Sequence, residues 1–363
     1  MKRLLWVLLI FVIAVLAFLL FAPTAVDPIA WTAPKPPSLR DGSYAHNERL
    51  QSVQRIAAIG VHGPESVAVD GAGNLYSGYA DGSIVRFDAD GAHAQHVANT
   101  GGRPLGIALM PDGSGLVVAD AFKGLLRIDT QGKMTTLTAA IDGQHFGFPD
   151  DVAVDAQGRY AYFSDASSKW SYGKDQLDLI DHGGFGRLLR YEFATGATTT
   201  LLRALQFANG VTLGPDDAYV LVTETGAYRV TRYWLKGDKA GTSDIFIDNL
   251  PCFPDNIRFN GRDRFWVALV APRSPLLEIF DRTPFARKML ARFVAVMSPP
   301  IESISMAAAY DRSGKLVANL QYTGPDAYRF ITQVTEAGPW LYLSSWRQDS
   351  LARISLAEAL AGL

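Results

Sequence analysis

The sequence predicts an all-β fold: a six-bladed β-propeller closed by an N-terminal strand, with an N-terminal transmembrane helix and a short helical insertion in blade five. Three observations support this prediction. One motif recurs along the chain, each interval between its copies can hold several short strands, and a long apolar segment precedes the first copy. Repeats of a few tens of residues that contain four strands each are typical of propeller blades.

The recurring motif is a turn led by Pro or Ala, followed by an oxygen-bearing residue and a short apolar run. The oxygen-bearing residues of its four copies are Glu65, Asp150, Asn209 and Asp255. Two more segments fit the same register with an apolar residue, at Leu105 and, more loosely, at Ile331. These six positions advance by 40, 45, 59, 46 and 76 residues, so we expect six blades.

The intervals contain strands and turns in the order that a blade requires. The second unit shows strands at 105–109, 115–120, 125–128 and 134–137, and the sequence Pro-Asp-Gly at 111–113 predicts a turn between the first two. The sixth unit has only three clear strands, at 331–335, 340–344 and 350–354. Because an open edge is normally covered, we expect residues 54–58 to supply its fourth strand and close the ring.

The fifth unit is long because its residues 275–294 carry apolar side chains at helical spacing. This pattern predicts a helical insertion between the second and third strands of the blade. Such an insertion would serve as a lid or as a cap that faces a membrane.

The N-terminal part of the chain predicts a membrane anchor and a linker. Lys2 and Arg3 precede an apolar run that ends at residue 22, long enough to cross a bilayer, although a cleaved signal peptide is the alternative. We therefore expect three segments: a transmembrane signal anchor at 1–22, a Pro-rich extended tether at 23–49 and the propeller at 50–363. The positive charges predict a single-pass protein whose propeller lies on the non-cytoplasmic side.

Composition limits the compartment and the partners. Cys252 is the only cysteine and the chain has no N-glycosylation sequon, which favours the periplasmic face of a bacterial inner membrane over the endoplasmic reticulum lumen. The chain has 34 Lys and Arg against 36 Asp and Glu, and no basic run beyond the N-terminus. This balance argues against a nucleic-acid partner.

The four oxygen-bearing residues predict a metal site. The innermost strand of each blade lines the central channel, so Glu65, Asp150, Asn209 and Asp255 should converge near the axis. Three carboxylates cannot share a channel without a counter-ion or strongly raised pKa values. Oxygen ligands without clustered His or Cys favour Ca²⁺ over zinc and magnesium. The alternative is that each residue merely caps its own turn.

Neighbouring residues give further candidates. Asp151 and Asn256 each come one residue after a motif residue, so their side chains would face the other side of the strand or a substrate. His145, like His62, precedes a motif on a loop that should face the same mouth, where it could bind substrate or transfer protons, or could simply be solvated. Acidic residues also recur at the ends of second strands, where we expect structural roles: Asp120, Asp165 and Glu224.

Several segments resemble the strictosidine synthase-like family, particularly its membrane-anchored branch. The resemblance covers roughly residues 55–355, and the segments that carry it are 103–106, 119–126, 186–191, 224–237, 249–251 and 254–257. The wider superfamily includes paraoxonases and gluconolactonases, six-bladed propellers with a calcium ion in the channel. The resemblance implies metal binding by the four motif residues, with Asn256 adjacent.

The residues that depart from the family pattern narrow the expected activity. The catalytic Glu of strictosidine synthases would fall at Thr332, so alkaloid condensation is not expected, and a paraoxonase-type histidine would fall near Leu105. The aspartate that gluconolactonase-type enzymes use is retained as Asp255. We therefore expect a membrane-anchored, calcium-dependent hydrolase of small-molecule lactones or esters, with Asp255 as its catalytic residue. The alternatives are a non-catalytic binding or scaffold propeller with a structural calcium, and a transporter or lipid-handling accessory.

Overall fold

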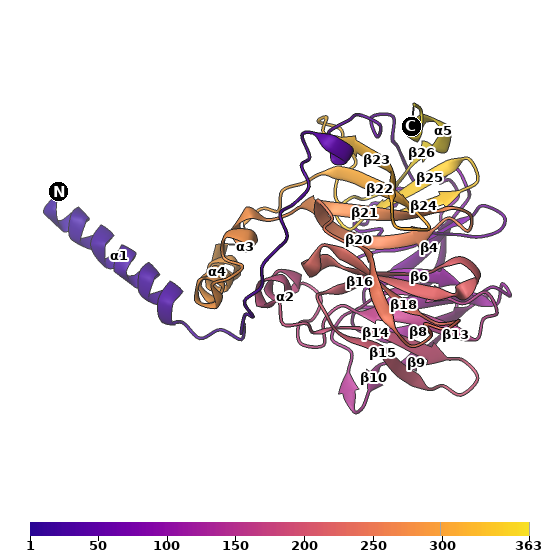
Figure 1. Cartoon of the computed structure of the whole chain (residues 1–363), viewed down its shortest axis with the longest axis horizontal. Helices are drawn as coiled ribbons and strands as arrows, with labels where there is room; N and C mark the ends of the chain where they lie inside the picture. The colour runs from indigo at the N-terminus through magenta and orange to yellow at the C-terminus, as the bar shows by residue number, and fades with distance from the viewer. Residues whose placement is uncertain (298, 363) are drawn as a thin grey trace.

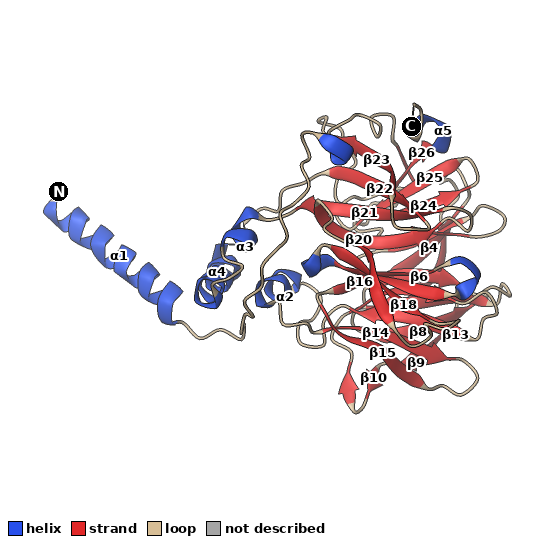
Figure 2. Cartoon of the chain, in the orientation of Figure 1, coloured by secondary structure: helices blue, strands red, loops and turns tan. Residues whose placement is uncertain are grey.

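Six four-stranded antiparallel sheets form the body of the protein, as the computed structural model shows for residues 1–297 and 299–362. Each sheet is one blade of a β-propeller, and the helices α1 to α4 lie on one side of it (Figure 1, Figure 2). The predicted six-bladed propeller is confirmed.

In each of the first five blades, sequence order and spatial order agree from the innermost to the outermost strand. The strands are, for blade 1, β2 (Ala68–Val69), β3 (Leu75–Gly78), β4 (Ser83–Phe87) and β5 (Gln95–Asn99); for blade 2, β6 (Pro104–Leu109), β7 (Gly115–Asp120), β8 (Gly124–Asp129) and β9 (Met134–Thr138); for blade 3, β12 (Pro149–Val154), β13 (Tyr160–Asp165), β14 (Gly186–Glu192) and β15 (Thr198–Leu205); for blade 4, β16 (Ala208–Leu213), β17 (Tyr219–Glu224), β18 (Arg229–Trp234) and β19 (Ser243–Ile247); and for blade 5, β20 (Cys252–Phe259), β21 (Arg264–Pro272), β22 (Ser305–Asp311) and β23 (Leu316–Tyr322).

The sixth blade joins the two ends of the propeller. Its inner strands are β24 (Ile331–Ala337), β25 (Trp340–Ser345) and β26 (Leu351–Ser355), and its outermost strand is β1 (Gln54–Ile56). Strand β1 pairs antiparallel with β26, with Arg55 opposite Ala352. The predicted closure by an N-terminal strand is therefore confirmed.

Helices and small elements interrupt the blades at three places. The predicted insertion in blade 5 consists of α3 (Pro275–Ile279) and α4 (Pro284–Met297), between β21 and β22 as expected. Blade 3 carries α2 (Asp175–Asp181) between β13 and β14, and the hairpin β10 (Ala140–Ile141) and β11 (Gln144–His145) precedes it. The remaining elements are α1 (Lys2–Phe21), η1 (Gly42–Tyr44), η2 (Pro215–Asp217), η3 (Thr225–Ala227) and α5 (Leu356–Ala359).

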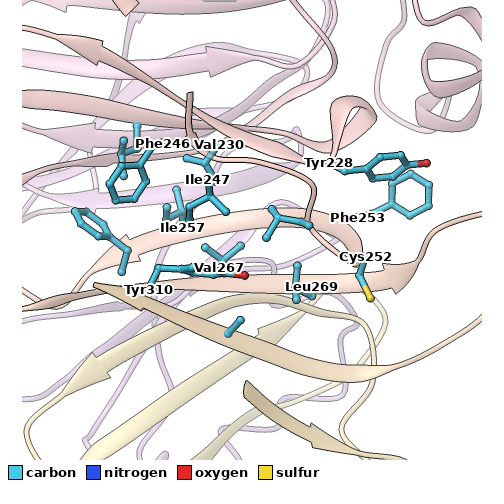
Figure 3. Close-up of a cluster of buried hydrophobic side chains, with 14 of the residues drawn as sticks. Tyr228, Val230, Phe246, Ile247, Cys252, Phe253, Ile257, Val267, Leu269 and Tyr310 are labelled. Carbon is cyan, nitrogen blue, oxygen red and sulfur yellow. The ribbon is translucent and has the colours of Figure 1, made fainter. Parts of the chain in front are cut away.

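Apolar side chains between neighbouring sheets hold the blades together. Residues on β21 alternate between two such interfaces: Val267 packs in the cluster shared with blade 4, and its neighbour Trp266 packs in the cluster shared with blade 6. Figure 3 shows the first cluster, in which Val230 and Ile247 of blade 4 meet Ile257 of blade 5. Burying each such side chain contributes about 1.5–3 kcal/mol to folding.

The tether, residues 23–49, is extended and lies against the propeller. Its backbone amides at Ile29 and Trp31 donate to the carbonyl oxygens of Asp181 and Asp281, at 3.0 and 3.1 Å. The Trp31 ring stacks on His182, with 4.3 Å between ring centroids. The tether thus connects α1 to α2 and to the loop between α3 and α4.

Closure by β1 gives a test of the fold. Deleting residues 50–60 should abolish cooperative thermal unfolding, because blade 6 loses its outermost strand and exposes the edge of β26. Circular dichroism of the full chain in detergent measures this transition, with Gln54→Ala, an exposed change on the same strand, as the control. A deletion variant that unfolds cooperatively at the wild-type temperature would contradict the closure.

The contact between Trp31 and His182 predicts a dependence of stability on pH. Burial, with help from Arg287 and Arg229, lowers the pKa of His182 to about 3, so the folded protein holds this imidazole neutral. The contribution of His182 is therefore complete above its unfolded pKa of about 6.5 and is lost as the pH falls towards 3. When the pH is lowered from 7 to 5, the protonation of this group should reduce the free energy of unfolding by about 2 kcal/mol.

Denaturant unfolding of the full chain in detergent at these two pH values measures the effect. The variant His182→Asn cannot titrate and tolerates the left-handed backbone at this position (φ 51°). It should lose correspondingly less stability on acidification. An equal loss in both proteins would show that His182 does not carry the effect.

Candidate active site in the central channel

A β-bulge interrupts the innermost strands of five blades at the level of the motif residues. Pairing with the second strand shifts register after Pro104, Pro149, Ala208, Pro254 and Ile331. A bulge leaves a residue unpaired and re-aims its side chain, and bulges are frequent beside active sites. The residues directly after these five positions, at the start of each bulge, are in order Leu105, Asp150, Asn209, Asp255 and Thr332. The bulges thus place Asp150, Asn209 and Asp255, together with Leu105 and Thr332, at one register position in five of the six blades.

The sixth register position is Thr332, so the assignment to Ile331 was wrong by one residue. Ile331 is paired with Ser345 in the sheet, and Thr332 is the bulged residue. The Thr332 hydroxyl donates to the carbonyl oxygen of Glu65 at 2.6 Å, which links blade 6 to blade 1. An aromatic residue two positions before the column could have revealed this register: Phe148, Phe207, Phe253 and Phe330.

Neighbouring innermost strands approach each other closely at this level. A Cβ atom on Gly106 of β6 would lie 2.5 Å from the Cα atom of Asp151 on β12. A Cβ atom on Gly210 of β16 would lie 2.4 Å from the Cα atom of Asn256 on β20. Glycine at these two positions therefore lets the strands meet around a narrow channel.

Glu65, Asp150, Asn209 and Asp255 are all buried, and the charges of the three carboxyl groups act on one another. Burial raises the pKa of Glu65 to about 8, although Arg103 opposes the rise. Burial raises the pKa of Asp150 and of Asp255 well above the usual range, and the Glu65 charge raises both further. The Asn209 side chain opposes the rise at Asp255. The Glu65 and Asp150 charges therefore act at Asp255, and coordination of one ion by the four motif residues stays a prediction.

Arg103 is the cation nearest to this group and was not predicted as a site residue. Its guanidinium lies 3.8 Å from Glu65 Oε2, and its Nη1 donates to the Gly63 carbonyl at 2.9 Å. Its Nε donates to the Tyr172 hydroxyl at 3.2 Å. Arg103 stands two residues before Leu105, where other blades have Phe. A buried arginine in place of an aromatic residue is the sequence signal that would have identified it.

Asp151, a predicted substrate-binding residue, takes part in a buried ion pair. Arg258 Nη1 and Nη2 donate to its two carboxylate oxygens at 2.5 and 2.6 Å. The Val211 amide donates to the same carboxylate at 2.7 Å. Asp151 of blade 3 is thus bound to blades 4 and 5, and both of its oxygens are engaged. Its role toward a substrate stays a prediction.

Asn256 and His145, the other two predicted substrate residues, lie in different surroundings. Asn256 is buried beside Asp255 on β20, and its Oδ1 has no hydrogen-bond partner within residues 1–297 and 299–362. His145 lies on the exposed hairpin strand β11, opposite Ala140. No hydrogen bond or ion pair joins His145 to the channel residues within the described part of the chain. The structure thus brings Asn256, but not His145, to the channel.

The acidic residues at the ends of second strands hold backbone and side chains of their own blades, as expected. Asp165 accepts hydrogen bonds from the Phe148 amide at 2.7 Å and from Arg187. Glu224 accepts from the Gln206 amide at 2.9 Å and from Arg229. Asp120 accepts from two amides of its own turn.

Helix α2 and its preceding loop cover the channel at the level of the motif. Tyr172 packs edge-on against Phe148, with 5.4 Å between ring centroids, and Phe148 packs against Phe207. Asp175, the first residue of α2, is close enough to raise the pKa of Asp150. No sequence signal pointed to Asp175, because its position depends on how the insertion folds back. Aromatic rings and a helix therefore separate the buried carboxyl groups from solvent.

The chemistry of these side chains fits an oxygen-binding cation. The buried oxygens Asn209 Oδ1, Asp255 Oδ1 and Asn256 Oδ1 have no hydrogen-bond partner in the part of the chain that the structure describes. With all four carboxyl groups ionised (Glu65, Asp150, Asp151, Asp255), the two guanidiniums (Arg103, Arg258) would leave two negative charges for a cation to balance, the difference between four and two. In residues 1–297 and 299–362, however, no three His, Cys, Asp or Glu side chains already form a group that could hold a metal ion. The donors are of the right kind, and side chains would have to rotate to coordinate.

Comparison of the sequence with known proteins shows the family. The strictosidine synthase family model matches residues 150–238, and the model of the N-terminal part of strictosidine synthase-like proteins matches residues 42–87. The adipocyte plasma membrane-associated protein of Salmo salar is 33% identical over 375 residues, which cover 96% of this chain and 88% of that protein. The human protein of that name is 31% identical over 95% of this chain and 87% of its own length. The strictosidine synthase-like protein 6 of Arabidopsis thaliana is 33% identical over 86% of this chain and 84% of its own length.

Solved structures share the fold at low sequence identity. A gluconolactonase from Xanthomonas campestris superposes with a TM-score of 0.61 at 15% identity, covering 92% of this chain and 98% of that structure. A calcium-binding regucalcin from Agrobacterium tumefaciens gives a TM-score of 0.56 at 16% identity, covering 83% and 90%. At these identities the likeness concerns the propeller alone. The curated relatives settle the family: the chain belongs to the strictosidine synthase-like proteins, with the adipocyte plasma membrane-associated proteins among its relatives.

Proposed function

We propose that this protein is a membrane-anchored hydrolase of lactones or esters that works with a calcium ion in the central channel. The observation that carries the proposal is the group of buried carboxyl groups, Glu65, Asp150 and Asp255, around unpartnered amide and carboxylate oxygens. A gluconolactonase and a calcium-binding regucalcin have the same fold, which supports the proposal without deciding the activity.

The proposed ligands of the cation are Glu65, Asp150, Asn209 and Asp255. Oxygen donors from carboxylate and amide groups are those that Ca²⁺ prefers. Bound there, the ion would balance the channel charge and supply electrostatic stabilisation of an oxygen that becomes negative during the reaction. Its binding would also favour the ionised form of Glu65, Asp150 and Asp255, whose pKa values burial raises.

Asp255 is proposed as the proton-transfer residue. Its carboxylate accepts a proton from the attacking water, whose oxygen forms a bond to the carbonyl carbon of the substrate. The carbon–oxygen bond to the leaving alkoxide then breaks, and the proton held at Asp255 passes to that alkoxide. The products are a carboxylic acid and an alcohol, joined in one molecule when the substrate is a lactone. Asn256, whose Oδ1 has no hydrogen-bond partner among the described residues, is proposed to accept a hydrogen bond from the substrate.

The surroundings of Asp255 support this assignment. The rings of Phe148 and Phe207 and the cover of α2 limit the access of bulk water, which strengthens electrostatic interactions at the reacting carbonyl. Arg258 forms an ion pair with Asp151 at 2.5 Å, which engages that neighbouring carboxyl group. Asp255 Oδ1 is fully buried and has no hydrogen-bond partner among the described residues.

A binding or scaffold propeller with a structural calcium is the second candidate. It is favoured by the absence of two bases found in related enzymes, since Thr332 and Leu105 occupy their positions.

The single-pass topology with a non-cytoplasmic propeller also belongs to the proposal. It is supported by α1, the one helix among the described residues that is long and apolar enough to span a membrane, a test that a signal sequence also passes.

The first test of the proposed activity is the variant Asp255→Asn. We expect kcat/KM for aryl esters and lactones to fall by about 100-fold or more, because an amide cannot accept the proton of the attacking water. Purified full-length protein in detergent with calcium present is assayed against a panel of both substrate classes. Asp263→Asn, which changes an exposed acidic residue in a β20–β21 turn, is the matched control. Equal hydrolysis by the wild type and Asp255→Asn would refute the role of Asp255, and no hydrolysis by either would favour the binding propeller.

The second test is calcium binding by itself. Isothermal titration of the full chain should show one ion per chain, and Asp255→Asn and Glu65→Gln should each weaken binding by at least about tenfold, because each variant replaces a charged donor. Calcium at 100 times its dissociation constant should raise the unfolding free energy by about 2.7 kcal/mol. Asp263→Asn should leave the affinity unchanged. Absence of binding at millimolar calcium would contradict the metal site, whereas binding without hydrolysis would leave the second candidate standing.

A further inference from the structure

The α3–α4 hairpin exposes more large apolar side chains than the rest of the propeller surface. Among the described residues after α1, eleven large apolar side chains are exposed, and six of them lie between residues 275 and 297. Ile279 and Val296 are 69% and 65% exposed. The six residues are Leu276, Ile279, Phe285, Phe293, Val296 and Met297. Contiguous apolar surface of this kind marks a site of contact with a membrane or another protein.

Helix α4 packs on the rest of the protein through the face opposite to its exposed apolar side chains. Leu290 and Ala291 pack against Val26 of the tether, against Trp170 before α2 and against Ile180 within α2. Residues 285, 289, 293 and 296 recur at the helical spacing of four, four and three on the other face. This free face of α4 is apolar, and Lys288 and Arg292 flank it along the helix. The helix therefore has the pattern of a segment that lies flat in a membrane interface.

The position of α4 beside α1 identifies what covers its free face. Arg292 Nε and Nη1 donate to the carbonyl oxygens of Ala22 and Leu19, at 2.6 and 2.7 Å. These carbonyl groups lie at the C-terminal end of α1, the apolar helix of which no residue is buried. If α1 spans a bilayer, its C-terminal end lies at the bilayer surface, and Arg292 holds α4 at the same depth. In Figure 1, α1 runs across the view away from the propeller and α4 is foreshortened beside its end, so the two axes cross.

We propose that the α3–α4 hairpin lies in the interface of the bilayer that holds α1, with its exposed apolar side chains among the acyl chains next to the headgroups. Lys288 and Arg292 lie where lipid phosphates would meet them, as basic residues do at the edge of an interfacial helix. Because α4 packs on α2 and α2 covers the channel, the cover of the channel then lies at the membrane surface. This placement is independent of the proposed hydrolysis, since it uses none of the channel residues.

Spin labels on the hairpin test the placement. Ile279→Cys and Val296→Cys are labelled with a nitroxide in the full chain, reconstituted in nanodiscs, with the buried Cys252 left in place. Collision with oxygen relative to a water-soluble nickel chelate should be at least fivefold higher at both sites than at a label on Met134→Cys. Met134 is the matched control because it is 40% exposed and lies on β9, at the outer edge of blade 2.

Each other outcome overturns the proposal. Labels at 279 and 296 that match the control would show that the hairpin faces water. Labels shielded from both reagents would show that protein, such as a second copy of this chain, covers the face. The spin-label test measures no enzyme activity. Its result would therefore be the same if the protein did not hydrolyse lactones or esters.

Discussion

The burial of several carboxyl groups around one axis is the constraint on which the rest of the site depends. Six innermost strands meet at the centre of a propeller, and water has little access there. Asp151 is compensated in full by Arg258, and Glu65 in part by Arg103, at 3.8 Å. Asp150 and Asp255 have no such partner among the ion pairs of the described residues, and burial holds the pKa of each far above its usual range. The fold therefore either keeps these groups protonated or holds a cation beside them.

The backbone makes this arrangement reproducible from blade to blade. A bulge in β12, β16 and β20 presents Asp150, Asn209 and Asp255, and hydrogen bonds across blades fix the bulges. The Thr223 hydroxyl donates to the Asp255 carbonyl at 2.6 Å, and the Thr332 hydroxyl donates to that of Glu65. Phe207 and Phe330, directly before β16 and β24, adopt left-handed backbone conformations with φ of 58° and 57°. Such strain in bulky residues is found where the surrounding structure holds a functional site in place.

The sequence predicted the blades and the motif residues because both repeat. A period in the motif and alternating apolar strands are visible without coordinates, and so are the unpaired edge that β1 covers and the helical spacing of α3 and α4. The partners of the motif residues do not repeat. Arg103 comes from the loop before β6, Arg258 reaches back from blade 5 to blade 3, and Asp175 comes from an insertion. The register of blade 6 was missed by one residue, because a bulge of one residue leaves no trace in apolar alternation.

The central claim is that one cation lies on the axis between the blades. Anomalous diffraction from crystals of the full chain soaked with terbium, a luminescent and strongly scattering substitute for calcium, tests this claim most directly. Our account predicts one dominant anomalous peak bounded by oxygens of Glu65, Asp150, Asn209 and Asp255, with Arg103 displaced from Glu65. Anomalous density only at the surface, with Arg103 still beside Glu65 and no peak on the axis, would contradict it.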